Sequence, residues 1–283
     1  MKTKENVFQV IDYSVSNESF HLKKHSDFDI LVTTPQPKAE GLYRYYKSED
    51  YISHTDARRN SFEKLYHLVR EFALKRKLAL IKKYGGSKKR LLDVGCGTGE
   101  FIQKAQQQNW QVTGVEPNEG ARRLANVKTE NAVTDIDALP LLTSKSFDVI
   151  TLWHVLEHLP NLHEQINVFK KLLTDDGALV VAVPNFKSFD AQHYKNFWAA
   201  YDVPRHLWHF SEKGMKQLMA HHGLQVVAVK PMIFDAFYVS LLSEKYKSGN
   251  MNFIKAFLIG AKSNWHARHT GAYSSLIYII KKQ

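Results

Sequence analysis

The sequence predicts an α/β fold built on a doubly wound, mostly parallel sheet, and two observations predict it. From residue 90 onward, short apolar runs alternate with segments of helical spacing, as in strands joined by crossover helices. The first run ends in a glycine-rich loop at 95–99, and the second ends in an acidic residue, Glu116. Parallel sheets bind ligands at the carboxyl ends of their strands, so both features predict a binding site at that edge.

The alternation places each element of the core. The expected strands are 90–94, 111–115, 147–152 and 178–183, and the expected helices lie around 100–108, 119–126 and 162–173. Beyond them, Ser211 caps a helix that ends at Gly223, and residues 224–229 form a strand. Residues 234–269 are expected to form an amphipathic helical insertion, and residues 273–280 a last strand.

Residues 1–40 precede the core and have β character. Polar turns separate three short runs that predict an antiparallel meander, at 7–13, 20–22 and 28–33. A meander of this size buries little surface by itself, so we expect it to pack on the main domain. The rest of the chain divides into a tyrosine-rich flap and helix at 41–88 and a main domain at 89–283, with the helical insertion at about 234–270.

The tyrosine-rich segment at 41–54 has two interpretations. Its rings pack on the core, or they form a flap over the ligand, because aromatic faces attract cations. A capping box at Asn60 and Glu63 then begins a helix, which Gly85 and Gly86 end.

Composition limits the kind of protein. The chain has 283 residues and a formal net charge of +11, and eight Lys or Arg lie between Lys75 and Arg90 without an acid. We interpret this run as a solvated helix face and loop, and keep nucleic acid as a less favoured partner. The single cysteine, Cys96, excludes an internal disulfide and a cysteine-cluster metal site. No run of 18 apolar residues and no apolar signal region occur, so we expect no membrane span and a cytoplasmic location.

The glycine loop has the spacing Asp93-x-Gly95-x-Gly97-x-Gly99. A dinucleotide fingerprint would need glycine at position 100, where the chain has Glu100. The spacing instead resembles motif I of the class I S-adenosylmethionine-dependent methyltransferases, of the bacterial small-molecule type similar to the ubiquinone-biosynthesis-like group. The resemblance implies a Rossmann-like fold with S-adenosylmethionine as cofactor. It assigns the methionine part to Asp93, Gly95, Gly97 and Gly99 and the ribose to Glu116, and the neighbouring Cys96 and Pro117 are further candidates for cofactor binding.

Two later segments match the same family. The resemblance implies that Asp135 accepts from the adenine amine and that the Ile136 amide faces the ring. Asp137 competes for the first role, and a solvated turn would also explain the aspartates. Trp153 and His154, at the end of the strand predicted for 147–152, would line the reactive end of the cofactor.

His154, Glu157 and His158 also have the H-x-x-E-H spacing of inverted zinc peptidases. That site needs a helix to present both histidines, and Pro160 argues against a helix continuing there. We therefore expect no metal site. Glu157 and His158 either begin a helix or belong to the acceptor site, and His158 is a candidate catalytic residue.

The aromatic loop at 186–205 is typical of a lid or a substrate wall. A similar Asp-Val-Pro-Arg-His segment recurs in bacterial methyltransferases of this type, so Arg205 and His206 are candidates for contact with the acceptor. His206 is the candidate general base, with a structural hydrogen bond as its alternative role.

These residues predict a methyltransferase that acts on oxygen of a small-molecule or saccharide-type acceptor and releases S-adenosylhomocysteine. Two alternatives stay open: an RNA methyltransferase and a cofactor-binding protein without catalysis. The insertion at 234–270 covers the acceptor pocket, forms a dimer interface or touches an acidic membrane surface. The last is the least favoured, because its apolar runs are short. The sequence leaves the acceptor and the oligomeric state open.

Overall fold

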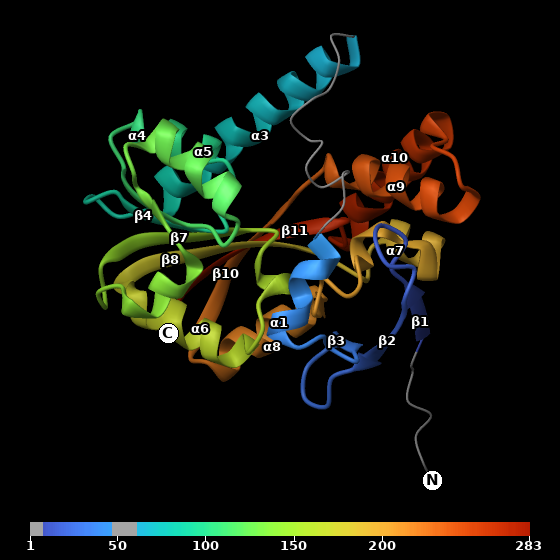
Figure 1. Ribbon diagram of the computed structural model, residues 1–283, viewed down its shortest axis with the longest axis horizontal. Coiled ribbons are helices and arrows are strands. Elements are labelled where there is room, and N and C mark those ends of the chain that lie inside the picture. Colours follow the sequence, from blue (N-terminus) through green and yellow to red (C-terminus); the bar gives the residue numbers. More distant parts are fainter. Residues whose placement is uncertain (1–7, 47–60) are drawn as a thin grey trace.

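A computed structural model describes residues 8–46 and 61–283. Its centre is a seven-stranded sheet in the order β10-β11-β8-β7-β4-β5-β6 (Figure 1). In chain order, its strands are β4 (Arg90–Val94), β5 (Gln111–Val115), β6 (Val133–Thr134), β7 (Phe147–Trp153), β8 (Leu173–Pro184), β10 (Leu224–Pro231) and β11 (Ser275–Lys282). β4 to β8 pair in parallel, and β11 is antiparallel to both β8 and β10. The predicted mostly parallel sheet with an antiparallel last strand is confirmed.

Helices cover both faces of this sheet (Figure 1). One face carries α3 (Ser61–Tyr84), α4 (Glu100–Gln106) and α5 (Glu119–Thr129). The other carries α6 (Leu162–Leu172) and α8 (Glu212–His221). Successive side chains of a strand point to opposite faces. In β4, Leu91 therefore enters the core beneath α3 and α4, and Leu92 enters the core beneath α6 and α8.

Several strand ends and one short strand differ from the expectation. β7 continues to Trp153, and β8 begins at Leu173 rather than at 178. Leu173 pairs with Phe147, so ladder hydrogen bonds extend the chain directly after α6. The two-residue strand β6 was not expected, because a pairing this short leaves no period in the sequence.

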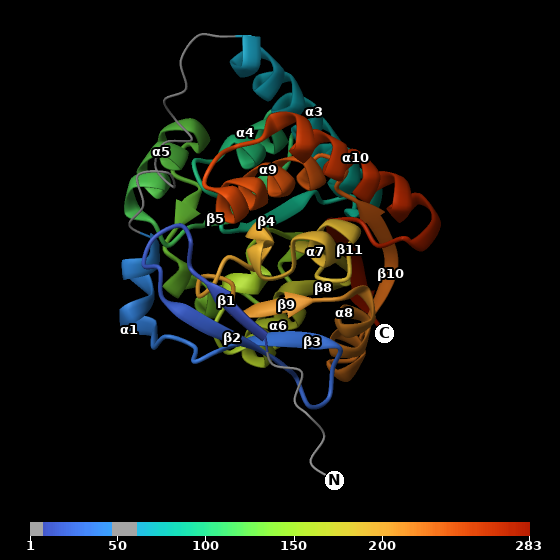
Figure 2. The same cartoon turned by 90° about the vertical axis from the view of Figure 1, so that its right-hand side faces the viewer.

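A smaller antiparallel sheet lies beside the main one and has the order β1-β2-β3-β9 (Figure 2). Its strands are β1 (Phe8–Ile11), β2 (Ser19–Lys24), β3 (Ile30–Thr34) and β9 (Trp208–Phe210). The first three are the predicted meander, followed by α1 (Ala39–Leu42) and the 3-10 turn η1 (Tyr43–Tyr46). β9 was expected to be loop and is a strand, because it pairs with β3 across more than 170 residues of sequence. The main domain thus supplies the fourth strand of the small sheet.

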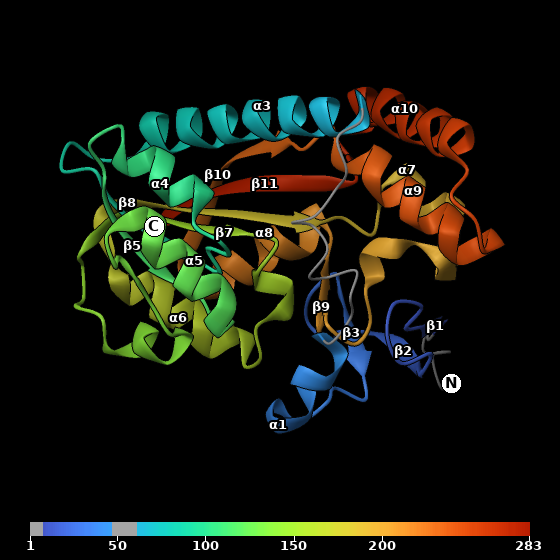
Figure 3. The same ribbon diagram turned by 45° about the horizontal axis from the view of Figure 1, so that its top comes forward.

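The helical insertion consists of α9 (Asp235–Ser248) and α10 (Phe253–Thr270), which lie beyond the carboxyl end of β8 (Figure 3). Gly249, with a φ of 79°, ends α9 and separates the two helices. The loop at 186–205 contributes α7 (Phe189–Tyr194) and the 3-10 turns η5 (Lys195–Phe197) and η6 (Ala199–Tyr201) beneath them. Among the described residues, the helices are all too short or too polar to cross a membrane.

Two predicted features lie partly outside the described residues. Residues 47–54 of the tyrosine-rich segment belong to these, as does Asn60 of the capping box. The helix predicted after the capping box is α3, and it ends directly before Gly85, as predicted.

Candidate active site

The loop after β4 needs its glycines for backbone geometry. Gly95, Gly97 and Gly99 have φ values of 68°, 57° and 83°, in the left-handed region that favours glycine. A Cβ at Gly95 would lie 2.6 Å from Val155, and one at Gly99 would lie 2.9 Å from Ala125. A Cβ at Gly97 would meet no heavy atom of the described residues within 4 Å. The Gly97 backbone therefore faces open space, which fits a bound cofactor.

Glu116 joins the loops that follow β4 and β5. One carboxylate oxygen accepts from the Gly97 amide at 2.9 Å, and the other accepts from the Asn118 amide at 2.9 Å. The Arg122 guanidinium donates to the backbone oxygens of Glu116, at 2.6 Å, and Pro117, at 3.2 Å. The buried carboxylate is held at the mouth of the glycine loop before any ligand binds.

Asp135 and Ile136 lie at the end of the neighbouring short strand. Asp135 caps the 3-10 turn η3 (Ile136–Leu141), where its side chain accepts from the Asp137 amide at 3.2 Å. It also pairs with Arg122 at 2.7 Å. Arg122 therefore links the predicted ribose and adenine positions, whereas Asp137 is exposed.

Asp93 is buried at the end of β4 and accepts a hydrogen bond from Thr151. Burial raises the pKa of Asp93 to about 7, although Thr151 and the Lys77 ammonium favour the charged form. Lys77, from α3, places its ammonium 4.5 Å from the centre of the Trp153 ring. The buried indole nitrogen of Trp153 has no hydrogen-bond partner among the described residues.

His154 follows β7 in the left-handed conformation, with a φ of 57°. Its Nδ1 lies 3.3 Å from a Glu157 carboxylate oxygen, and its Nε2 lies 3.1 Å from a carboxylate oxygen of Asp235, in the first turn of α9. Burial disfavours the imidazolium, but these two carboxylates outweigh burial and raise the pKa of His154 to about 10. His154 is therefore a cation between two anions at neutral pH.

Glu157, His158 and His206 form a cluster beyond the end of β7. The rings of His158 and His206 meet edge to face, with centres 4.5 Å apart. His206 Nδ1 lies 2.9 Å from the Ala200 carbonyl oxygen. The second carboxylate oxygen of Glu157 is buried without a hydrogen-bond partner among the described residues. Ligand atoms of the three side chains all lie within 4.8 Å of one another, close enough to hold a metal ion.

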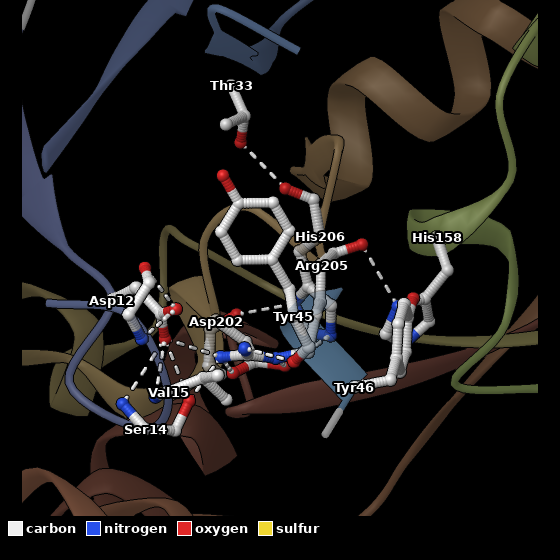
Figure 4. Close-up of polar contacts among 12 residues, drawn as sticks. Asp12, Ser14, Val15, Thr33, Tyr45, Tyr46, His158, Asp202, Arg205 and His206 are labelled. Carbon is white, nitrogen blue, oxygen red and sulfur yellow. Dashed lines mark hydrogen bonds and ion pairs between the residues drawn. The ribbon is translucent and has the colours of Figure 1, made fainter. Parts of the chain in front are cut away.

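Burial also sets the charge states in this cluster. Burial and the charge of His206 lower the pKa of His158 to about 4. Burial by itself would raise the pKa of Glu157, but the hydrogen bond with His154 and the nearby histidine charges outweigh it and lower that pKa. A neutral His158 thus lies beside an anionic Glu157. Figure 4 shows His158 with Tyr46, whose hydroxyl lies 3.1 Å from His158 Nδ1.

Comparison with known proteins decides the family. Residues 62–229 match the family described as "Methyltransferase domain". The chain belongs to this family. Its methyl donor is S-adenosylmethionine.

Individual relatives are more distant. A ubiquinone biosynthesis O-methyltransferase of Idiomarina loihiensis is 27% identical over 56% of this chain and 70% of its own length. The C-methyltransferase NovU of Streptomyces niveus is 30% identical over 49% of this chain and 33% of its own. Several other curated relatives are matched over about half of their length, 46% or 47%.

Solved structures agree on the fold of this methyltransferase. One is the 1,6-didemethyltoxoflavin-N1-methyltransferase of Burkholderia thailandensis, with bound 1,6-didemethyltoxoflavin and S-adenosylhomocysteine. It is 13% identical, with a TM-score of 0.53 over 93% of this chain and 96% of that one.

Arg205 lies where the methyltransferase joins its two sheets. Its guanidinium donates to Asp12 at 3.0 Å, to Asp202 at 2.6 Å, to the Tyr45 carbonyl oxygen at 2.9 Å and to Ser14 (Figure 4). Its own carbonyl oxygen lies 3.0 Å from His158 Nδ1. These contacts occupy the guanidinium, and direct contact of Arg205 with the acceptor stays a prediction.

The structure also separates the two histidines of the zinc-peptidase spacing. Glu157 and His158 lie in the 3-10 turn η4 (Leu156–His158), whereas His154 has a left-handed backbone before it. The helix that would present both histidines to zinc does not form. Burial raises the pKa of the Cys96 thiol in the glycine loop.

Sequence reasoning missed Lys77 and Asp235. Lys77 belongs to the basic run that we interpret as solvated. The sequence could have revealed it, because its helical spacing places it on the same side of α3 as the core residues Leu74, Leu78 and Ile81. Asp235 had no local signal, because it lies about 80 residues after His154 in the sequence and only the fold brings the two together.

Proposed function

We propose that this methyltransferase acts on oxygen of a small-molecule or saccharide-type acceptor, with His206 as the general base. The observation that carries the proposal is the cluster of buried Glu157, half-buried His158 and buried His206 beyond β7. Methylation of a hydroxyl requires removal of its proton, and an imidazole beside a carboxylate can accept one.

For the cofactor, the proposal assigns each part of the ligand to the end of one of four strands, β4, β5, β6 and β7, and to the loop that follows it. Asp93, Gly95, Cys96, Gly97 and Gly99 hold the methionine part, Glu116 and Pro117 the ribose, Asp135 and Ile136 the adenine, and Trp153 and His154 the reactive end. The bound sulfonium supplies an activated methyl group and leaves as a neutral thioether. The protein then has to align the acceptor and exclude water.

The acceptor half assigns roles to His206, Glu157 and Arg205. His206 accepts the proton of the hydroxyl, and the Glu157 carboxylate stabilises the imidazolium that forms. His158 and Arg205 complete the site, because the Arg205 carbonyl engages His158 Nδ1 and fixes the direction of its ring. Arg205 acts through this contact as a positioning residue.

Replacement of the base tests the proposal. We expect His206→Ala to lower kcat by about a hundredfold or more and to leave S-adenosylmethionine affinity unchanged, because general bases contribute about 10²–10⁴ in rate. Turnover across an acceptor panel and calorimetric titration of the cofactor measure the two effects. His21→Ala, at an exposed position on β2, is the matched control. Full turnover by His206→Ala would remove His206 from the mechanism.

A chelator distinguishes a proton relay from a metal centre in the same cluster. With His206 as base, activity survives exhaustive chelation, and added Zn²⁺ inhibits by occupying the imidazoles and Glu157. Activity that is lost on chelation and restored by a divalent cation would instead make the cluster a metal site.

The acceptor panel also includes two further classes of acceptor, and one observation supports each of them. The relative NovU is named a C-methyltransferase, so product analysis must distinguish a new methyl ether from a new carbon–carbon bond. The net charge of +11 favours RNA as a second candidate acceptor. Salt-dependent retention on RNA, together with methyl transfer to it, would replace the small-molecule proposal.

A further inference from the structure

The helix α10 has its small residues inside and its large apolar residues outside. The residues that it buries are Ala256, Gly260, Ser263 and Ala267. A Cβ at Gly260 would lie 2.7 Å from the Phe237 ring of α9, so the two helices approach closely. The opposite side exposes Ile254 (78%), Phe257 (62%), Leu258 (59%) and Trp265 (61%). A surface helix normally has the reverse arrangement.

The exposed side chains lie along one stripe of the helix. Ile254, Leu258 and Trp265 are separated by four and seven residues, which places them on the same face. Phe257 lies next to them, stacked on Phe237 at 5.4 Å between ring centres. A contiguous apolar surface of this kind marks a binding surface on a folded protein.

The charged side chains of α10 itself all have one sign. From Lys245 to the last residue, the chain has seven Lys or Arg and no Asp or Glu. Lys262 and Arg268 are exposed on α10 beside the apolar stripe. Lys255 also lies there and pairs with Glu244 of α9 at 3.1 Å. The surface therefore combines apolar side chains with positive charge.

We propose that the outer face of α10 docks on the surface of an anionic lipid bilayer. Ile254, Leu258 and Trp265 enter the boundary between headgroups and acyl chains, and Lys262 and Arg268 meet the lipid phosphates. A second copy fits this face less well, because a twofold axis would bring like charges together where α10 offers no acid. Nucleic acid fits less well because, of these apolar side chains, only Phe257 and Trp265 offer a ring to stack on a base, whereas Ile254 and Leu258 offer neither a ring nor a hydrogen bond.

The short apolar runs of residues 234–270 made lipid the least favoured partner by sequence. Folding changes this, because α10 packs its small residues on α9 and collects its large ones on one side. The proposal concerns where the enzyme binds and does not depend on its acceptor.

Vesicle flotation tests the proposal with the full chain. We expect binding to vesicles that contain phosphatidylglycerol, no binding to phosphatidylcholine vesicles, and weaker binding at high salt, which screens the charges. Ile254→Gln with Leu258→Gln should lower the partition coefficient about tenfold or more, because two exposed apolar side chains no longer leave water. Leu124→Gln with Val127→Gln, two exposed apolar residues of α5, is the matched control and should bind as the wild type does.

Three outcomes would overturn the proposal. The first is a lack of flotation with anionic vesicles at low salt, and the second is equal loss of binding in the α5 control. The third is a dimer, measured by light scattering without lipid, that dissociates in the α10 variant and would assign this face to a second copy. Cofactor titration of both variants checks that each is folded, since the α10 stripe lies outside the proposed cofactor contacts.

Discussion

At the scale of the residue, the Glu116 carboxylate is already bound to two backbone amides, those of Gly97 and Asn118. These bonds fix the carboxylate at the place where the cofactor ribose is proposed to lie. A ribose hydroxyl would therefore meet an oriented, charged acceptor. The sequence predicted this residue from its position at a strand end, and the structure adds what orients it.

We predict that Glu116→Gln weakens S-adenosylmethionine binding by about tenfold to a hundredfold. The amide has one acceptor oxygen and no charge, and charge-assisted hydrogen bonds contribute about 1.5–3 kcal/mol each. Calorimetric titration measures the change, with Glu119→Gln on the exposed first turn of α5 as control. Unchanged affinity in a folded Glu116→Gln protein would exclude Glu116 from the cofactor site.

His154 makes the stability of the protein depend on pH. Asp235 and Glu157 outweigh burial and raise the pKa of His154 to about 10, whereas the unfolded chain has a pKa near 6.5. The protonated form therefore stabilises the fold fully below pH 6.5, and this contribution is lost as pH rises toward 10. Solvent screens part of it, because the His154 side chain is 35% exposed.

The variant His154→Asn tests this dependence. Asparagine tolerates the left-handed backbone at this position, so the substitution removes the titration with little strain. Thermal unfolding midpoints from pH 6 to pH 10 should fall more steeply for the wild type than for the variant. Parallel curves would show that His154 does not carry the effect.

At the scale of the element, hydrogen bonds and an ion pair of Arg205 join the small sheet to the main domain. Its guanidinium reaches Asp12, which directly follows β1, and the Tyr45 carbonyl oxygen, in η1. Its backbone carbonyl oxygen meanwhile lies 3.0 Å from His158 Nδ1 in the candidate active site. The loop that leads into β9 therefore couples the meander to the proposed acceptor site.

Removal of this ion pair should be costly. We predict that Arg205→Met destabilises the protein by about 3 kcal/mol, because it leaves the buried Asp12 charge without its cationic partner. Urea unfolding measures the loss. Arg123→Met breaks a pair with Glu119 on the surface of α5 and should cost less than about 1 kcal/mol. Similar losses for the two variants would contradict the role given to Arg205.

At the scale of the whole molecule, the meander and the main domain share a sheet. β9 comes from the segment between β8 and β10, and it pairs with β3. The Thr33 amide also donates to the Leu207 carbonyl oxygen at 3.0 Å. Neither part can complete its backbone hydrogen bonds without the other.

We therefore predict one cooperative unfolding transition for the full chain. Calorimetric and van't Hoff enthalpies should agree, and circular dichroism and tryptophan fluorescence should give the same midpoint. Two separated transitions would mean that the meander unfolds as an independent unit. The predicted division into residues 1–40, 41–88 and 89–283 would then be a division into folding units.

The sequence by itself determined the α/β class, the positions of the core strands along the chain and the positions of Gly95, Gly97, Gly99 and Glu116. These features are local. A buried strand needs a short apolar run, and a tight turn needs glycine, so each is written within a few neighbouring residues. The match to a methyltransferase family covers residues 62–229, which include these features.

The tertiary structure decided which segments far apart in the sequence contact one another. β9, the bond from Arg205 to Asp12 and the contact of Asp235 with His154 all join residues far apart in sequence, and their partners cannot be read from neighbouring positions. Burial then decided charge, since the pKa of Asp93, His154 and His158 moves with the groups packed around each one. Packing also changed how α10 is interpreted. Its small residues face α9 and its large apolar residues are exposed, so the helix has an apolar outer surface that the sequence did not reveal.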